Sequence, residues 1–326
     1  MKVVVALGGN ALLERGEPPD SNIQEWHVTR AVSALAPLLV QHQLIITHGN
    51  GPQVGVLALE SASDPALSHP YPFDVLGAQT QGMIGYWLVQ ALHAAAPGTP
   101  AACVICRTLV KADDPAFASP TKFVGPVYDE TSAKRLAAER GWDVRQDGQA
   151  WRRVVPSPEP AELIELGPIK LLIGSGVTVV CAGGGGVPVV ADGAGGLHGV
   201  EAVVDKDLTA ALLARELGAD ALLLLTDVEA VLEGYGTPQA RPIRATTARD
   251  LRARPFAAGS MGPKVEAACR FAEATGGTAA IGRLGDACAL LDGTAGTIIS
   301  AVEGRRRTLH PPTGVHQDLR RRHRIM

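Results

Sequence analysis

The stretch VVVALGGNALL, residues 3–13, decides the fold. Three valines run through an alanine and a leucine into two glycines, an asparagine and a second apolar run. A short apolar, β-branched run that stops at glycine is typical of a buried strand followed by a tight turn. Glycine has no Cβ, so the backbone can approach an anion closely and present its N–H groups. We therefore expect a buried strand over 2–7 that ends at an anion-binding turn at Gly8 and Gly9.

Apolar runs of strand length alternate with helix-compatible stretches in the first third of the chain. Strands are expected over 2–7, 44–49 and 101–110, and helices near 24–41 and 75–95. This order builds a parallel sheet with right-handed crossovers, so the sequence indicates an α/β protein.

The same alternation resumes later in the chain. An apolar, glycine-interrupted block at 169–190 precedes a helix expected at 205–217, a very apolar strand at 219–228, a helix near 260–275 and a strand at 278–284. The run ALLLLT is compatible with a helix by periodicity alone. Its length and polar boundaries favour a strand that is buried on both faces.

Residues 111–162 interrupt the alternation with Asp-Asp-Pro, Gly-Pro and PSPEP. A compact domain rarely contains a structureless loop of that length. The alternating run AWRRVVP, residues 150–156, could pair as part of a small sheet. We therefore predict a small protruding subdomain at about 111–162.

Composition indicates an ordinary globular protein. The chain of 326 residues is 46% hydrophobic and 19% charged, with 37 glycines. No apolar run reaches the ~18 residues that a membrane span needs, and the N-terminus lacks a cleavage pattern typical of a signal peptide. A cytoplasmic protein without membrane contact is the expectation.

The C-terminal 24 residues differ in charge from the rest of the chain. Residues 303–326 hold seven arginines against Glu303 and Asp318, so the remainder is more acidic than the net charge of −3 indicates. An acidic body is a poor nucleic-acid binder, and no nucleic-acid partner is expected. The tail is polar and interrupted by proline, which favours a mobile extension over a partner-binding arm.

Five cysteines in apolar contexts favour reduced thiols over a disulfide framework. Cys103 and Cys106 form a C-x-x-C, but they are expected on opposite faces of the strand 101–110. A core position is favoured over a redox or metal pair.

Five expected strands end at glycine or polar residues. The segments are GGNA (8–11), HGNGPQVG (48–55), AGGGGVPV (182–189), VVDKDLTA (203–210) and TDV (226–228). Ligands of open parallel sheets bind at the carboxyl ends of the strands, so these loops are expected to converge on one site. They match neither the P-loop nor the Rossmann dinucleotide pattern, which excludes the two commonest nucleotide fingerprints.

Two lysines are expected in the first turn of helices, Lys206 in VDKDLT and Lys264 in GSMGPKVEAA, and Lys122 lies in SPTKFVGP. A lysine at that end of a helix opposes the helix dipole, so it needs an anionic partner. Phosphoryl transfer requires mainly charge stabilisation, which lysines, Mg²⁺ and backbone N–H groups supply.

Taken in order, the segments VVALGGNAL, THGNGPQVG, SPTKFVGP, CAGGGGVPV, VVDKDLTAALLA, LTDV and GSMGPKVEAA closely resemble the carbamate kinases of the amino acid kinase superfamily. The resemblance covers about residues 1–300. It implies an open αβα sandwich with a mainly parallel central sheet, in two lobes plus the small protruding subdomain. The lobes would be 1–195 for carbamate or carbamoyl phosphate and 196–302 for nucleotide, followed by the tail 303–326.

The resemblance also implies a function. Such enzymes are homodimers that transfer a phosphoryl group reversibly between ADP and carbamoyl phosphate with Mg²⁺. Here the metal would be carried by ATP or ADP, with no protein ligand assigned.

Site residues follow from the matching motifs. The resemblance implies catalytic roles for Lys122, Lys206, Asp207 and Lys264. It implies binding of the phosphoryl group and carbamate by Gly8, Gly9, Asn10, Ala11, Asn50, Gly51 and Gln53. The nucleotide site would include Gly183, Gly184, Gly185, Gly186, Thr226, Asp227, Val228, Tyr235, Met261 and Gly262.

Some points stay open at this stage. Phe123 stands where the family usually has proline, which affects the loop of Lys122. His48 is expected to have a structural hydrogen-bonding role rather than to carry a proton, because the carbamate oxygen is already an anionic nucleophile. Two alternatives stay open. One is another amino acid kinase, acting on acetylglutamate, aspartate or a nucleotide. The other is an inactive nucleotide-binding regulator on the same fold. The direction of the reaction in the cell is open as well.

Overall fold

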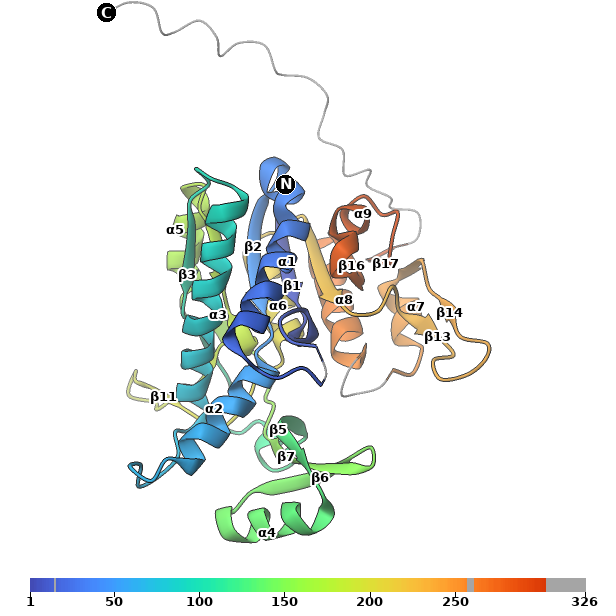
Figure 1. Cartoon of the computed structure of the whole chain (residues 1–326). Coiled ribbons are helices and arrows are strands. Elements are labelled where there is room, and N and C mark those ends of the chain that lie inside the picture. Colours follow the sequence, from blue (N-terminus) through green and yellow to red (C-terminus); the bar gives the residue numbers. More distant parts are fainter. Residues whose placement is uncertain (15, 257–260, 303–326) are drawn as a thin grey trace, which may run out of the picture.

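The computed structural model of the chain describes residues 1–14, 16–256 and 261–302, so the predicted tail 303–326 lies outside the described residues. An eight-stranded sheet in the order β15-β17-β16-β12-β1-β2-β9-β3 runs through the described part (Figure 1). Every neighbouring pair in it is parallel except β16 and β17. Its strands are β1 (Lys2–Leu7), β2 (Gln43–His48), β3 (Ala101–Val104), β9 (Thr178–Cys181), β12 (Ala221–Thr226), β15 (Ala245–Thr247), β16 (Thr278–Arg283) and β17 (Thr297–Ser300).

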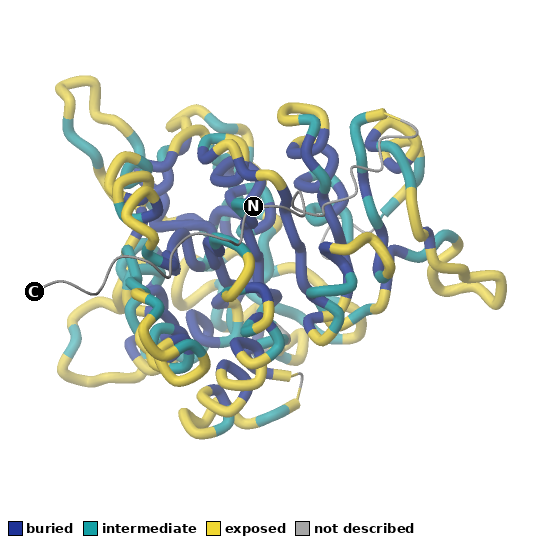
Figure 2. Tube along the Cα trace, turned by 90° about the horizontal axis from the view of Figure 1, so that it is seen from above, coloured by how far each residue is buried: buried dark blue, intermediate teal, exposed yellow. Residues whose placement is uncertain are grey.

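Helices cover both faces of this sheet. One face packs against α1 (Ser21–Gln41), α3 (Phe73–Ala95) and α9 (Ala287–Leu291), and the other against α5 (Leu166–Gly174), α6 (Lys206–Glu216) and α8 (Met261–Thr275). Successive side chains of a strand point to opposite faces, so β1 contributes Val3, Val5 and Leu7 to the first core and Val4 and Ala6 to the second. Buried residues accordingly fill the middle of the molecule in Figure 2. The predicted αβα sandwich with a mainly parallel sheet is confirmed.

The shorter elements lie around the sandwich. The helix α2 (Gly51–Ser63) follows β2, and α7 (Ala248–Arg252) precedes α8. A four-stranded sheet contains β11 (Leu197–Gly199), β10 (Val187–Ala191), β4 (Arg107–Leu109) and β8 (Glu162–Leu163), and a hairpin contains β13 (Leu232–Glu233) and β14 (Arg241–Pro242). Short 3₁₀ turns are η1 (Gly9–Ala11), η2 (Pro115–Phe117), η3 (Gly183–Gly185) and η4 (Leu284–Asp286).

The expectation of one strand over 101–110 is wrong. The segment divides into β3 of the large sheet and β4 of the four-stranded sheet, with Cys106 between them. The side-chain amide of Gln81 on α3 binds the backbone there. Its Oε1 accepts from Cys106 N at 2.9 Å and its Nε2 donates to Cys106 O at 3.1 Å. The carbonyl of Cys106 also accepts from the backbone nitrogen of Val187 on β10 at 2.8 Å. Because both backbone groups of Cys106 are satisfied, the chain can leave one sheet and enter another.

Residues 122–155 form a separate small sheet beside the sandwich (Figure 1). It contains β5 (Lys122–Tyr128), β7 (Ala150–Val155) and β6 (Asp143–Asp147), in that order, with α4 (Glu130–Arg140) beside them. The strand expected in AWRRVVP is β7. We call this unit, 122–155, the subdomain. The division of the rest into two lobes stays a prediction, since β1 and β12 are direct neighbours in one sheet.

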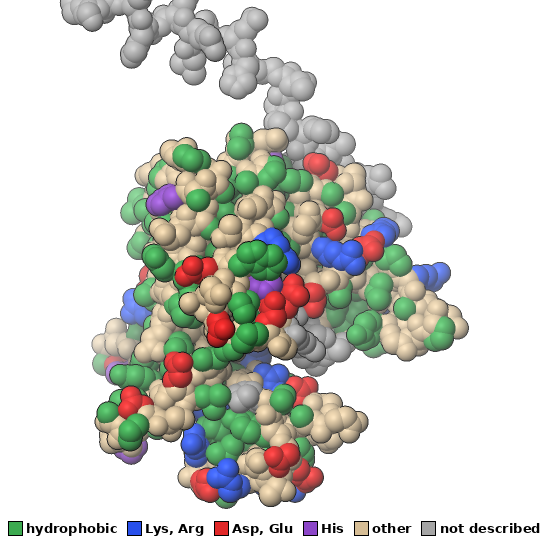
Figure 3. All heavy atoms as spheres, in the orientation of Figure 1, with side chains coloured by type: hydrophobic (Ala, Val, Ile, Leu, Met, Phe, Trp, Pro, Cys, Tyr) green, Lys and Arg blue, Asp and Glu red, His purple; other side chains and the backbone are tan. Residues whose placement is uncertain are grey.

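No helix of the described residues is both long enough and apolar enough to cross a bilayer. The five cysteines are free thiols, of which Cys106, Cys181 and Cys269 are buried. On the face seen in Figure 3, acidic and basic side chains are interspersed, as on an ordinary solvated surface.

Candidate active site

A cavity of about 950 Å³ opens where the central strands end. Because β1, β2 and β12 are parallel neighbours, the loops after them meet at one edge of the sheet. These loops line the cavity together with the start of β5 in the subdomain and the first turns of α6 and α8. The convergence that the strand-end motifs predicted is therefore present.

The glycine turns after β1 and β2 are in close contact. A Cβ on Gly49 would lie 2.9 Å from the backbone nitrogen of Gly9 and 3.3 Å from Cδ of Lys206. Only bare backbone fits at this distance. The two turns thus bring their backbone amides together beside the stem of Lys206.

A cluster of lysines and aspartates lies at the start of α6. Asp207 is only 5% exposed, and its two oxygens accept from Lys206 Nζ at 2.6 Å and from Lys264 Nζ at 2.9 Å. Lys264 comes from the first turn of α8. One buried carboxylate therefore holds two ammonium groups that belong to different helices.

The neighbouring Asp205 has two functions at the same place. Its Oδ1 caps α6 by accepting from the backbone nitrogens of Asp207 and Leu208, and its Oδ2 accepts from Lys122 Nζ at 2.6 Å. Lys122 belongs to β5, so this ion pair joins the subdomain to the cluster. We call Lys122, Asp205, Lys206, Asp207 and Lys264 the lysine–aspartate cluster.

The pKa values in the cluster follow from burial and from charge. Burial alone would raise the pKa of Asp207, but the ammonium groups of Lys206 and Lys264 outweigh it and hold that pKa well below its usual range. Burial lowers the pKa of Lys206 despite the attraction of Asp207. For Lys264, burial also favours the neutral form, but Asp207 outweighs burial and raises the pKa.

The cluster has an excess of positive charge. Three ammonium groups face two carboxylates, and the lysines of α6 and α8 lie at the positive ends of helix dipoles. Such an arrangement stabilises an added anion, and backbone amides at Gly8 and Gly9 are close enough to the same cavity to share it. The geometry fits a phosphoryl group.

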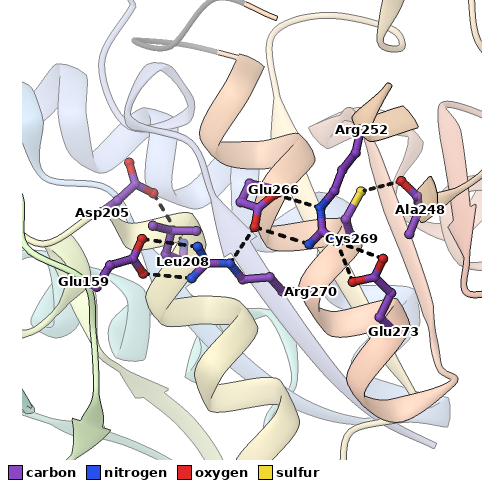
Figure 4. Close-up of polar contacts among 9 residues, drawn as sticks. All are labelled: Glu159, Asp205, Leu208, Ala248, Arg252, Glu266, Cys269, Arg270 and Glu273. Carbon is purple, nitrogen blue, oxygen red and sulfur yellow. Dashed lines mark hydrogen bonds and ion pairs between the residues drawn. The ribbon is translucent and has the colours of Figure 1, made fainter. Parts of the chain in front are cut away.

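The helix that carries Lys264 is held from outside by an ionic network (Figure 4). Arg252 on α7 donates to Glu266 and Glu273 of α8, with Nε–Oε2 at 2.9 Å and Nη1–Oε2 at 2.6 Å respectively. Arg270 on α8 donates from both terminal nitrogens to Glu159, at 2.7 and 3.2 Å. Arg252 binds two positions of α8 separated by two turns and so connects α7 to α8.

Most of the predicted site residues line this cavity. They are Gly8, Gly9, Asn50, Gly51, Lys122, Gly184, Lys206, Asp207, Thr226, Asp227, Val228, Tyr235, Met261 and Lys264. Gly262 lies between the lining residues Met261 and Pro263. Asn10 and Ala11 lie in η1 directly after Gly9, and the side chain of Asn10 lies outside what the structure describes.

Gln53 is placed differently from the expectation. It is 2% exposed on α2, and its Nε2 donates to Gln24 Oε1 of α1 at 2.9 Å. Its side chain therefore joins two helices, and its proposed contact with carbamate stays a prediction.

The glycine run 183–186 makes close contacts with the walls of the site. Of the four glycines, Gly184 lines the cavity, and an added Cβ on it would lie 2.2 Å from Asn50 Nδ2. A Cβ added to one of the other three glycines would also meet a neighbouring atom: His48 Nε2 at Gly183, Val204 O at Gly185 and Thr108 Oγ1 at Gly186. Their role in nucleotide binding stays a prediction.

His48 is buried beside this run. Its Nδ1 is 3.0 Å from the carbonyl oxygen of Gly49, which can only accept, so Nδ1 carries the proton in the neutral ring. The pKa of His48 is lowered to about 4, mainly by burial, with the Gly49 hydrogen bond opposing the shift and the charge of Lys206 adding to it. The ring is thus neutral at neutral pH, which agrees with a structural role.

Replacing Gly183 by alanine should destabilise the protein by about 1–3 kcal/mol, because the new methyl group would lie 2.2 Å from His48 Nε2. His48→Ala in the same chain removes the ring, so the double variant should lose less stability than the sum of the single losses. Urea unfolding measures both. Gly174→Ala is the matched control, since a Cβ there meets nothing within 4 Å. Equal losses for Gly183→Ala and Gly174→Ala would contradict the expectation.

Several lining residues were not among the predicted site residues. One of them is Asp205, although an aspartate directly before a helix is a helix-cap signal that could identify it. Glu233, Arg254 and Phe256 also line the cavity, and Arg254 Nη1 donates to Glu233 Oε1 at 2.7 Å. Their sequence context contains no comparable signal.

The sequence of the chain is similar to those of known kinases. The model of the Amino acid kinase family matches residues 1–282. The chain is 52% identical over 305 residues to the carbamate kinase of Rhizobium meliloti (strain 1021), which covers 92% of this chain and 94% of that protein. It is 49% identical over 298 residues to the carbamate kinase of Escherichia coli (strain K12), covering 91% of this chain and 99% of that protein.

The structure of the chain is also similar to that of a carbamate kinase. The carbamate kinase from Giardia lamblia bound to AMP-PNP superposes with a TM-score of 0.84 at 41% identity, covering 92% of this chain and 98% of that chain. The chain therefore belongs to the amino acid kinase family, and within it to the carbamate kinases.

Proposed function

We propose that the protein catalyses reversible phosphoryl transfer between ATP and carbamate. In one direction, ADP and carbamoyl phosphate give ATP and carbamate, which decomposes to ammonia and carbon dioxide. One observation carries the proposal. Asp207 binds Lys206 and Lys264 and holds their ammonium groups in the cavity beside the glycine turns. The carbamate kinase relatives support the same assignment over more than nine tenths of the chain.

The reaction needs little covalent help from the protein. An oxygen of the β-phosphate of ADP attacks phosphorus, the bond from phosphorus to the carbamate oxygen breaks, and carbamate leaves with the electron pair. No proton is transferred in this step. The developing charge lies on the phosphoryl oxygens, where Lys206, Lys264 and the amides of Gly8 and Gly9 would stabilise it.

The substrates would divide along the cavity. Asn50 and Gly51 belong to the first 195 residues and would bound the carbamate end. Thr226, Tyr235 and Met261 belong to 196–302 and would bound the nucleotide end, together with Arg254 and Phe256. This division corresponds to the two predicted lobes.

Mg²⁺ would enter with the nucleotide phosphates. The ion usually keeps several waters and is bound by phosphate oxygens with one or two carboxylates. Asp227 lines the same cavity and would supply a carboxylate oxygen, whereas no group of three or more His, Cys, Asp or Glu side chains suited to a metal occurs among the described residues. When bound, Mg²⁺ neutralises charge on the transferring group. A homodimer in the cytoplasm, without nucleic-acid or membrane partners, belongs to the same proposal.

The decisive assay is ATP formation from ADP, Mg²⁺ and fresh carbamoyl phosphate, followed through hexokinase and a dehydrogenase. We expect rapid ATP formation with carbamoyl phosphate and little with acetyl phosphate. Acetylglutamate, aspartate and nucleoside monophosphates, tested in parallel with ATP, cover the other acceptors of the family. A folded protein that binds ADP and forms no ATP would contradict the proposal and favour a regulator on the same fold.

A further inference from the structure

One of the places where the subdomain contacts the main body is a short segment, residues 201–205, which leads into α6. Lys122 of β5 binds Asp205, with Nζ–Oδ2 at 2.6 Å. The backbone nitrogen of Val203 donates to the carbonyl of Pro156 at 3.0 Å, directly after β7. Arg153 of β7 donates from Nη2 to Glu201 Oε1 at 3.0 Å. Every second residue of the segment thus contacts the subdomain or the residue that follows it, at positions 201, 203 and 205.

The strand register links these contacts to each other. Lys122 is paired with Val155 across the β5–β7 ladder, and Val124 with Arg153. Arg153 is therefore only two residues along its strand from the partner of Lys122. A displacement of β7 from the main body at Arg153 must move Lys122 as well.

Arg153 is enclosed on three sides. Its guanidinium carbon lies 4.7 Å from the ring centre of Phe73 on α3 and 4.6 Å from that of Trp142 in the subdomain. Glu201 accepts from Arg153 with one oxygen and from the backbone nitrogen of Phe73 with the other, at 2.8 Å. Stacking of arginine on aromatic rings and a carboxylate partner both favour this position. The arginine thus connects the subdomain to the start of α3 and to residue 201 at once.

The arginine side chain is mostly buried, with 18% of it exposed, and its Nε is buried without a hydrogen-bond partner. A buried donor without a partner is unfavourable for folding, so the two rings and Glu201 must outweigh that cost. Around it Val54, Phe73, Leu76, Val124 and Val155 form a small apolar core between subdomain and body. At its edge a Cβ on Gly55 of α2 would lie 2.8 Å from Gly125 Cα of β5.

The connection that returns from the subdomain is fixed as well. Glu159 binds Arg270 of α8 through both carboxylate oxygens, and its backbone nitrogen donates to Asp114 Oδ2 at 3.0 Å (Figure 4 for the first contact). These contacts hold the base of the subdomain. The position of the subdomain over the cavity then depends on the contacts of Arg153, Pro156 and Lys122 and on the packing of β5 against α2.

We propose that Arg153 and Glu201 are positioning residues for the phosphoryl-transfer site. They dock the subdomain on residues 201–205 and thereby hold the ammonium group of Lys122 at the start of α6. The proposal rests on the proposed function and on the catalytic role that the resemblance implies for Lys122, which lines the cavity. Neither residue lines the cavity by itself, so each acts through Lys122.

The experiment is a double-mutant cycle. We compare the wild type with Arg153→Ala, Glu201→Gln, Lys122→Ala and the double variant Arg153→Ala/Lys122→Ala. Arg153→Lys tests rescue by a charge that can still reach Glu201. Arg135→Ala is the matched control, because Arg135 is an exposed arginine of the same subdomain that pairs with Glu139 within α4. Readouts are kcat and KM for carbamoyl phosphate, Kd for ADP, and hydrogen exchange of residues 122–155.

Arg153→Ala should lower kcat/KM for carbamoyl phosphate by about 10–100-fold, since small misplacements of a positioned group cost this much. The Kd for ADP should stay within about twofold, and exchange over 122–155 should become faster than in Arg135→Ala. Glu201→Gln should act in the same direction, and Arg153→Lys should recover part of the activity. In the Lys122→Ala background, Arg153→Ala should have no further effect on kcat/KM.

The proposal would be overturned if the loss of kcat/KM in the double variant equalled the product of the two single losses, because Arg153 would then act independently of Lys122. Wild-type kinetics in Lys122→Ala, or unchanged exchange over 122–155 in Arg153→Ala, would overturn it too. Absence of ATP formation by the wild-type protein would instead count against the proposed function. In that case hydrogen exchange still decides whether Arg153 and Glu201 dock the subdomain.

Discussion

Lys206→Ala should lower kcat for ATP formation by at least about 10²–10³-fold. That is the effect of losing one donor that stabilises developing charge, and Lys206 carries a full charge. Its side chain is 14% exposed, its ammonium group contacts Asp207, and the residue lines the cavity beside the Gly9 and Gly49 turns. Because the lost interaction strengthens as charge develops on the phosphoryl oxygens, kcat should fall much more than the affinity for ADP.

The measurement is steady-state ATP formation together with ADP binding by calorimetry. Lys170→Ala is the control, since Lys170 is an exposed lysine on α5 and its loss should leave both values unchanged. Circular dichroism and the melting temperature establish that the Lys206 variant is folded. A folded variant with near-normal kcat would remove Lys206 from the mechanism.

The features that could be predicted from the sequence are those that depend on local patterns. The bounds of β1 agree with the apolar run that ends before Gly8. The helix α6 starts at Lys206, directly after Asp205 and before an apolar stretch, as its sequence predicts. Parallel order then places the ends of β1, β2 and β12 together, so the convergence of their loops follows from topology. Lys206 and Lys264 come together for the same reason, since each begins a helix on the same face of the sheet.

The features that the sequence did not reveal depend on partners distant in the chain. The break at Cys106 depends on Gln81, 25 residues earlier, and the orientation of Gln53 depends on Gln24 of another helix. The helix α2 begins at Gly51-Pro52, inside the segment 48–55 that the glycine pattern predicts to be a loop, although proline is common in a first helical turn. No spacing rule relates Arg153 to Glu201, so only the packed structure brings them together.

Asp207→Asn should destabilise the protein by about 3 kcal/mol and lower kcat by about 10²-fold. Asparagine keeps the shape but removes the charge between two buried ammonium groups, and breaking a buried ion pair from one side leaves charge uncompensated. The lysines would repel each other and lose the common acceptor that fixes both Nζ atoms. Urea unfolding and the ATP-forming assay measure the two effects.

The loss of stability should depend on pH with a definite sign. The pKa of Asp207 is held well below its usual value by the two lysines, so the unfolded chain takes up a proton before the folded protein does. The contribution of Asp207 to stability is therefore fully present above about pH 5, beyond the ordinary aspartate pKa of about 4, and is lost progressively as the pH falls toward its folded pKa. The difference in unfolding free energy between wild type and Asp207→Asn should be constant from pH 6 to 8 and smaller at pH 3 to 4.

A second substitution separates loss of charge balance from loss of packing. Lys206→Met keeps the aliphatic stem and removes one buried cation, so Asp207→Asn/Lys206→Met should be more stable than Asp207→Asn alone while remaining inactive. This recovery is expected because one ammonium group beside a neutral amide is less unfavourable than two. If the double variant were less stable than Asp207→Asn, the carboxylate would act mainly through its hydrogen bonds and shape. Charge compensation between α6 and α8 would then no longer explain why an aspartate lies at position 207.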